Sequence, residues 1–167
     1  MGAEEHRKHA GKSVTCAVIT VSDTRSPDTD ESGKAIIKIL KEHNHEVKGY
    51  IIVKDDIDKI QKALREAMED PAVSAIILNG GTGMTSRDNT VEAIHSFIEK
   101  EMPGFGELFR SLSFEQIGAA AMLSRAMAFV SEKKVIFSLP GSTEAVKLAT
   151  ERLIAHELGH LISEVNR

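Results

Sequence analysis

Glycine-rich and acidic segments of this chain have the residue types of a site for nucleotide phosphates. The loop Gly80-Gly81-Thr82-Gly83 follows the apolar run Ala75–Leu78 and precedes a helical pattern that begins near Thr90. Glycines let backbone N–H groups approach an anion closely, and a helix N-terminus adds a favourable dipole. The loop is neither a Walker A sequence nor a Rossmann fingerprint, so a plain turn is the alternative interpretation.

Two carboxylates are candidate ligands for Mg²⁺ beside that loop. Asp88 follows the glycine-rich segment, and the acidic cluster Asp55, Asp56 and Asp58, which can supply a second ligand, follows the apolar run Val47–Val53. Mg²⁺ takes one or two carboxylates together with substrate phosphates. The alternative for each is helix capping. Thr90 competes with Asp88 for one cap, and one acid of the cluster is expected to cap the helix that follows it.

Two further loops are expected to face the same crevice. The loop after the run Val14–Val21 is polar and long for a connection, which favours binding. The loop after Lys134–Phe137 leads into a long helix, whose N-terminus Ser142 or Thr143 can cap and which offers a second anion site. The candidate binding residues of these loops are Ser22, Asp23, Ser138, Pro140, Gly141 and Ser142.

The elements that position these loops form an α/β pattern. The four apolar, β-branched runs are typical of strands buried on both faces. Apolar residues at helical spacing predict helices around the segments 35–40, 57–68, 93–98 and 143–165. Met102–Met127 interrupts the alternation as one insertion with helical segments. We expect a three-layer fold, a mostly parallel sheet with helices on both faces, which binds ligands at the carboxyl ends of its strands.

The composition is that of one globular domain. The chain has 167 residues, of which 41% are hydrophobic and 28% charged. We expect a polar extension over residues 1–12 and a single domain over 13–167. A net charge of -4 excludes a general basic field for nucleic acid. The lone Cys16 is expected to be a buried structural thiol. No signal-peptide core or membrane-length apolar run is present, so we expect the cytoplasm.

His156-Glu157-Leu158-Gly159-His160 matches the zinc-protease signature H-E-x-x-H. The apolar stripe of this helix runs through Ile154, Leu158 and Leu161, so the helical period places both histidines on the opposite, solvated face. A catalytic zinc needs a third protein ligand, and position 166 is asparagine. We therefore expect at most adventitious metal binding by this pair.

A series of short motifs resembles the MogA/MoaB family of molybdenum cofactor biosynthesis proteins, which is related to the gephyrin G domain. The motifs occur in family order from about Ser13 to the C-terminus. They are Thr20–Asp23, Asp30–Gly33, Gly80–Gly83, Arg87–Ala93, Pro103–Glu107, Phe109–Ser113, Leu123–Ala126 and Leu139–Ser142. The chain departs from the family at Val91, where proline is frequent, and at Phe129, where glycine is usual.

The resemblance implies an α/β fold, a homo-oligomer (trimer or hexamer) and adenylylation of molybdopterin by Mg-ATP with release of pyrophosphate. It implies Asp88 and Asp55 as the catalytic, metal-binding carboxylates and Gly80 to Gly83 as the phosphate loop. Ser22, Asp23 and Ser138 to Ser142 would line the crevice that nucleotide and pterin share. The alternative is a non-catalytic pterin- or nucleotide-binding or scaffold protein, which would not need two metal-binding acids.

Overall fold

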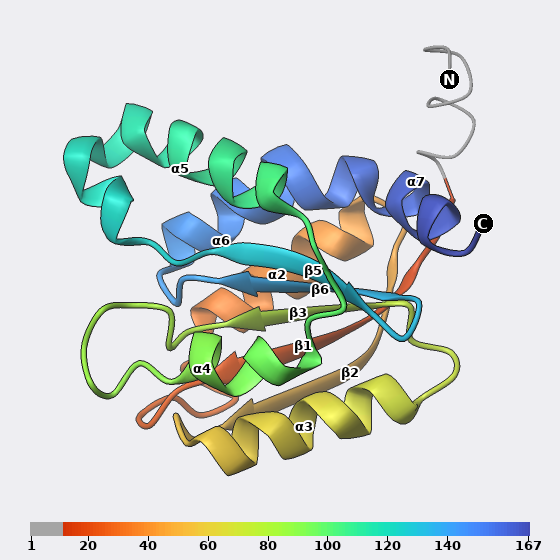
Figure 1. Ribbon diagram of the computed structural model, residues 1–167, viewed down its shortest axis with the longest axis horizontal. Coiled ribbons are helices and arrows are strands. Elements are labelled where there is room, and N and C mark those ends of the chain that lie inside the picture. The colour runs from red at the N-terminus through yellow and green to blue at the C-terminus, as the bar shows by residue number, and fades with distance from the viewer. Residues whose placement is uncertain (1–11) are drawn as a thin grey trace.

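The computed structural model describes residues 12–167 and contains one six-stranded sheet in the order β2-β1-β3-β6-β5-β4 (Figure 1). Strands β2, β1, β3 and β6 run parallel, and β5 and β4 complete the sheet in antiparallel pairs. The predicted mostly parallel α/β fold is confirmed. Except for Lys12, the predicted extension over 1–12 lies outside the described residues. The strands are β1 Thr15–Val21, β2 Glu46–Val53, β3 Ala75–Asn79, β4 Lys100–Glu101, β5 Met127–Ser131 and β6 Lys134–Leu139.

Helices cover both faces of the sheet and make the fold three-layered (Figure 1). One core joins the sheet to α2, α5, α6 and α7, and a second core joins it to α3 and α4. Alternate side chains of β1 point into the two cores: Val18 packs in the first and Ile19 in the second. The helices are α2 Glu31–Glu42, α3 Ile57–Glu69, α4 Thr90–Ile94, α5 Pro103–Ile117, α6 Thr143–Ala149 and α7 Ala155–Val165.

Strand β2 does not follow the prediction that all four runs are buried on both faces. It lies at one edge of the sheet, and Tyr50 and Ile51 are 37% and 45% exposed. An edge strand has a neighbour on one side only, so water reaches side chains that a central strand would bury. The apolar sequence of β2 predicts a strand, but it cannot predict the place of that strand in the sheet.

Strands β4 and β5 were not predicted. Within the expected insertion, α5 is followed by a 3₁₀ segment over Gly118–Leu123, after which the chain re-enters the sheet as β5. A two-residue turn at Glu132-Lys133 joins β5 to β6, with φ values of 49° and 61°. Such turns usually carry asparagine or glycine because both central residues have positive φ. The Glu-Lys pair gives no turn signal, so the hairpin escaped prediction.

The last helical segment extends over Thr143–Val165 as predicted, with a π-helical turn over Thr150–Ile154 between α6 and α7. His156 is exposed, but the side chain of His160 is only 12% exposed, which corrects the prediction that both histidines face solvent. Glu157 and Glu164 lie beside His160 at 3.2 and 3.6 Å. Among residues 12–167, no three His, Cys, Asp or Glu side chains group as metal ligands.

Two further expectations concern Cys16 and membranes. Cys16 is fully buried, and burial raises the pKa of its thiol to about 12, as expected for a structural cysteine. No helix formed by the described residues combines the length and the apolar character that crossing a membrane requires.

Asp30 anchors the loop between β1 and α2. Its carboxylate is fully buried, caps α2 by accepting from the Gly33 N–H at 3.0 Å, and accepts from the Tyr50 hydroxyl at 2.5 Å. Arg25 lies 3.4 Å from the same carboxylate. Burial works to raise the pKa of Asp30, but the hydrogen bonds from Thr20, Tyr50 and Gly33 outweigh it, so the pKa lies below its ordinary value.

Asp30→Ala is expected to lower the free energy of unfolding by about 3 kcal/mol, because it leaves buried donors without an acceptor. The lowered pKa stabilises the fold above the unfolded-state pKa of about 4, and that stability is lost as pH falls through the folded value. Asp30→Asn should therefore flatten the acid limb of the stability curve. Urea unfolding between about pH 3 and pH 7 tests this, with the exposed Asp28→Ala as the control. Equal acid limbs for wild type and Asp30→Asn would contradict it.

Candidate functional site

A cavity of about 520 Å³ opens at the carboxyl ends of β1, β3 and β6. The glycine-rich loop after β3 forms one wall, and the loops after β1 and β6 form the others. This is the edge at which open α/β sheets bind ligands. The predicted residues that line the cavity are Ser22, Gly80, Gly81, Thr82, Gly83, Asp88, Pro140 and Gly141, and they are joined by Val21, Thr24, Arg25, Leu123 and Ser124.

The end of β1 and the loops after β3 and β6 pack so closely at this wall that only glycine fits at some positions. Gly80 has a φ of 99°, and a Cβ atom there would lie 2.1 Å from the Val21 carbonyl oxygen. A Cβ on Gly141 would lie 3.1 Å from the Gly80 Cα. The backbone is tied in place because the Thr90 hydroxyl donates to the Gly80 carbonyl at 2.7 Å. The loop therefore brings bare backbone to the cavity, as an anion site requires.

Asp88 lines the cavity and does not cap α4. Asn89 holds the capping position without a side-chain hydrogen bond, while Thr90 bonds to Gly80. The Asp88 carboxylate accepts from the N–H and the hydroxyl of Thr85, at 2.9 and 2.6 Å. The hydroxyl bond in particular lowers the pKa of Asp88 and so favours the ionised form. A half-buried, ionised carboxylate beside a phosphate loop is suited to hold a divalent cation.

Asp55 lies behind the glycine-rich loop and not on the cavity wall. Asp56 caps α3 by accepting from the Lys59 N–H at 3.1 Å, so Asp55 is the acid left over. One Asp55 oxygen accepts from the Asn89 N–H at 3.0 Å. A Cβ on Gly81 would lie 2.7 Å from the other oxygen. Burial raises the pKa of Asp55, and the negative charges of Asp88 and Asp23 raise it further.

The two carboxylates flank the same loop. A Cβ on Gly83 would lie 2.8 Å from the nearer Asp88 oxygen, much as one on Gly81 would approach Asp55. Two oxygen donors and no nitrogen or sulfur donor suit Mg²⁺, which completes its coordination with water and substrate phosphates. Asp55 and Asp88 therefore fit the predicted metal-binding role by donor type, and of the two only Asp88 lines the cavity.

Ser22 and Asp23 organise the loop after β1. The Ser22 hydroxyl accepts from the N–H groups of Thr24 and Arg25, at 3.3 and 3.1 Å. Asp23 does not line the cavity: its carboxylate accepts from the Asp55 N–H at 3.1 Å and from the Arg87 guanidinium at 3.0 Å. Arg87 and Asp23 thus form an ion pair.

Ser138 and Ser142, both predicted to bind the ligand, do not line the cavity. Ser138 lies within β6 and is fully buried in the sheet, because the strand continues to Leu139. Ser142 caps α6 by accepting from the Ala145 N–H at 3.3 Å. The cavity wall between them consists of Pro140 and Gly141.

Two arginines at this edge of the sheet were not among the predicted site residues. Arg25 lines the cavity and donates to the Gly141 carbonyl at 2.8 Å, which joins two of its walls. Arg125 donates to carbonyl groups of the glycine-rich loop. Arg125 stands in the motif Leu123–Ala126 and Arg25 in the polar loop after β1, but neither has a sequence neighbour that indicates its partners. Each acts on a segment distant along the chain.

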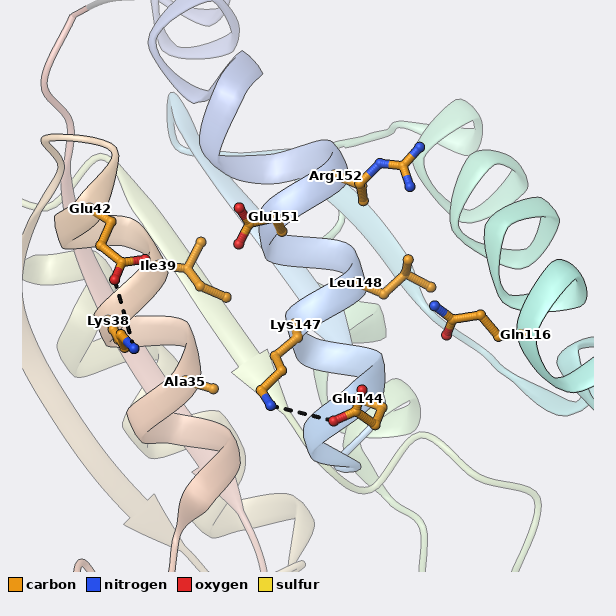
Figure 2. Close-up of a pocket in the computed structure, with 10 residues that line it drawn as sticks. All are labelled: Ala35, Lys38, Ile39, Glu42, Gln116, Glu144, Lys147, Leu148, Glu151 and Arg152. Carbon is orange, nitrogen blue, oxygen red and sulfur yellow. Dashed lines mark hydrogen bonds and ion pairs between the residues drawn. The ribbon is translucent and has the colours of Figure 1, made fainter.

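A second hollow of about 430 Å³ lies between α2, α6 and the end of α5. Figure 2 shows ion pairs within single helices, Lys38 with Glu42 and Lys147 with Glu144, at 3.8 and 3.4 Å. These side chains are about half exposed or more, and such pairs contribute little. The hollow contains no glycine-rich loop and neither candidate carboxylate, so the cavity at the strand ends is the candidate functional site.

Comparison with known proteins identifies the family of this chain. The family described as "Probable molybdopterin binding domain" matches residues 17–160. The molybdenum cofactor biosynthesis protein B of Halalkalibacterium halodurans is 54% identical over 166 residues, which cover 99% of this chain and 98% of that protein. A crystal structure of a molybdenum cofactor biosynthesis protein B has a TM-score of 0.91 at 47% identity and covers 94% and 98% of the two chains. The tungsten cofactor synthesizing protein MoaB from Pyrococcus furiosus has a TM-score of 0.83 at 37% identity, with 93% and 99% covered.

Proposed function

The chain belongs to the molybdopterin-binding domain family of molybdenum cofactor biosynthesis proteins, and we propose that it adenylylates molybdopterin with Mg-ATP. The products would be adenylylated molybdopterin and pyrophosphate. The observation that carries this proposal is the cavity in which a bare glycine-rich loop meets Asp88, with Asp55 directly behind the loop. A site of this composition suits transfer between phosphate groups, because that chemistry needs positioning and charge neutralisation above all.

The reaction joins two anions. An oxygen of the pterin's terminal phosphate attacks the α-phosphorus of ATP, a new P–O bond forms, and the bond from the α-phosphorus to the bridging oxygen of pyrophosphate breaks. The Gly80 N–H donates to the Leu139 carbonyl at 3.0 Å, so the remaining N–H groups of the loop would bind polyphosphate oxygens, and Arg25 adds a cation to the cavity lining. The proposal requires no covalent enzyme intermediate.

Mg²⁺ would be held by Asp88 and Asp55. When bound, it would neutralise part of the charge on the polyphosphate. The protein's own contribution is to keep the Asp88 carboxylate ionised through Thr85 and to place it at the mouth of the loop. Asp55 is fixed from two sides, by the Asn89 N–H and by the bond from its own N–H to Asp23.

Pyrophosphate release tests the proposal directly. Purified protein with ATP and Mg²⁺ should release pyrophosphate only when molybdopterin is present, in an amount that matches the adenylylated pterin formed. Omission of Mg²⁺ should abolish release. Equilibrium binding of nucleotide or pterin without release would instead favour the non-catalytic binding or scaffold alternative.

We also propose that the protein is a homo-oligomer, a trimer or hexamer, with α5 and the turn that follows it at the interface. Five large apolar side chains are between 57% and 75% exposed in this one region: Leu108, Phe114, Ile117, Met122 and Leu123. Exposed apolar residues gathered in this way are typical of interfaces between protein chains. A second copy of the same chain is the occupant that the proposal names.

Phe114→Glu is expected to dissociate the oligomer, because a carboxylate in an apolar interface loses hydration without gaining a partner. Light scattering at micromolar concentration should show a mass near that of the 18.2 kDa chain, against a multiple of it for wild type. Ile57→Glu is the matched control, since Ile57 is 41% exposed but lies on α3. An unchanged mass for Phe114→Glu would remove α5 from the proposed interface, and a monomeric wild type would refute the oligomer.

A further inference from the structure

We propose that Arg125 is a positioning residue that holds the glycine-rich loop in its ligand-binding form. Its guanidinium donates to three carbonyl oxygens. Two belong to the glycine-rich loop, Thr82 at 3.2 Å and Gly83 at 2.7 Å, and the third belongs to Asp88, at 3.2 Å. Arg125 therefore links the residue before the segment Met84–Arg87 to the residue after it. The effect on turnover rests on the proposed function, but the effect on the loop does not.

The contacts place Arg125 behind the loop. Arg125 is not among the residues that line the cavity, although Leu123 and Ser124 just before it are. The carbonyl oxygens of Thr82 and Gly83 are turned toward the guanidinium, so a cation satisfies them and keeps them from facing an anionic ligand. The same contact to the Asp88 carbonyl fixes the backbone from which the proposed metal-binding carboxylate projects.

The stretch from Met84 to Arg87, between these carbonyl groups, has few other contacts with the rest of the site. Met84 is 68% exposed, and the residues from Met84 to Arg87 are all exposed. The ion pair from Arg87 to Asp23 involves an Arg87 side chain that is 81% exposed, where such pairs are weak. Arg125 is 26% exposed and bonds to three backbone groups at once. It therefore holds both sides of this exposed stretch from a single side chain.

Glu92 orients the arginine. Its carboxylate accepts from Arg125 at 2.5 and 3.4 Å through two oxygens, and the hydrogen bond lowers the pKa of Glu92. Glu92 stands on α4, the helix that follows the loop. A planar guanidinium can serve carboxylate and carbonyl acceptors together, whereas lysine supplies a single point of charge. The geometry thus requires arginine and not merely a positive residue.

The first test follows the loop itself by hydrogen–deuterium exchange. In Arg125→Ala, amides of residues 80–90 should exchange about tenfold faster or more, because several charge-assisted hydrogen bonds are lost, while core amides of β1 and β3 stay protected. Arg125→Lys should show the same faster exchange in residues 80–90. It replaces the alanine variant in the test if that variant does not fold. Arg152→Ala, at an exposed arginine on the far hollow, is the matched control. Unchanged exchange in both Arg125 variants would overturn the proposal.

The second test separates positioning from substrate binding. For Arg125→Ala, kcat for pyrophosphate release should fall about 100-fold, as expected for a displaced reacting geometry, with a smaller change in the KM for the pterin. Added guanidinium ion should restore part of the rate in Arg125→Ala and none in Asp88→Ala. Full activity of Arg125→Lys would overturn the role of the planar group. If wild type releases no pyrophosphate, the proposed function fails, and the exchange experiment still decides the role of Arg125.

Discussion

Asp88→Ala should abolish pyrophosphate release while the protein stays folded. The loss should be at least about 100-fold, because the carboxylate is proposed to hold the cation that neutralises the polyphosphate. Stability should change little. Asp88 is half-buried, and the bonds it accepts come from Thr85 in its own turn, so their loss is expected to cost about 1 kcal/mol.

Three variants make this experiment decisive. Asp58→Ala removes an exposed acid from α3 near Asp55 and should keep the wild-type rate. Asp55→Ala should lose activity as Asp88→Ala does, because both acids are proposed to hold one ion. Thermal unfolding of each variant establishes that it is folded before rates are compared. A folded Asp88→Ala enzyme with a rate near wild type would refute the role of Asp88.

Gly80→Ala should be the most damaging single methyl addition in the site. The residue has a φ of 99°, and the new Cβ would lie 2.1 Å from the Val21 carbonyl oxygen. The obstacle is backbone of the central strand β1, which cannot turn aside as a flexible side chain can. Positive φ costs a residue with a Cβ about 1 to 2 kcal/mol, and overpacking costs a similar amount, so we expect a loss of about 3 kcal/mol and of ATP binding.

Two other glycines separate the causes of that effect. Gly118→Ala tests positive φ alone, because its φ is 64° but nothing lies within 4 Å of a new Cβ. We expect it to cost about 2 kcal/mol, because its ψ of -145° places it in a region that essentially only glycine adopts. Gly104→Ala, in the first turn of α5 and with open space around it, should be neutral or stabilising by about 0.5 kcal/mol. Urea unfolding measures the stability of all three variants. If Gly80→Ala loses no more stability than Gly118→Ala, the backbone of β1 moves to make room for the new methyl group.

The fold was largely predictable because its signals are local. The four apolar runs became β1, β2, β3 and β6, and the stripes of helical period became α2, α3 and the last helical segment. Capping was predictable as far as the candidates, an acid before α3 and Ser142 or Thr143 before α6, and the structure assigns the caps to Asp56 and Ser142, each bonded to an N–H three residues on. The third helical stripe, over residues 93–98, extends past the α-helix: α4 ends at Ile94 and a 3₁₀ turn follows.

The site was predictable only in part. Residue types and glycine spacing indicated the loop Gly80–Gly83 and Asp88, which do line one cavity. They also indicated Ser138 and Ser142, which do not line it. Strand β6 extends to Leu139 and so buries Ser138, and Ser142 caps α6. Arg125 was missed because its partners lie about 40 positions away along the chain.

The sequence by itself therefore determined the element types, the α/β class and the loops that carry glycine and acid, because these depend on neighbours within a few positions. Strand order, the exposure of β2 and the β5–β6 hairpin were decided only by tertiary structure. Tertiary structure also decided that Asp23, Asp55 and Asp88, which follow three different strands, lie near one another. Such contacts depend on which strand ends lie side by side, and that order results from the packing of the whole sheet against its helices.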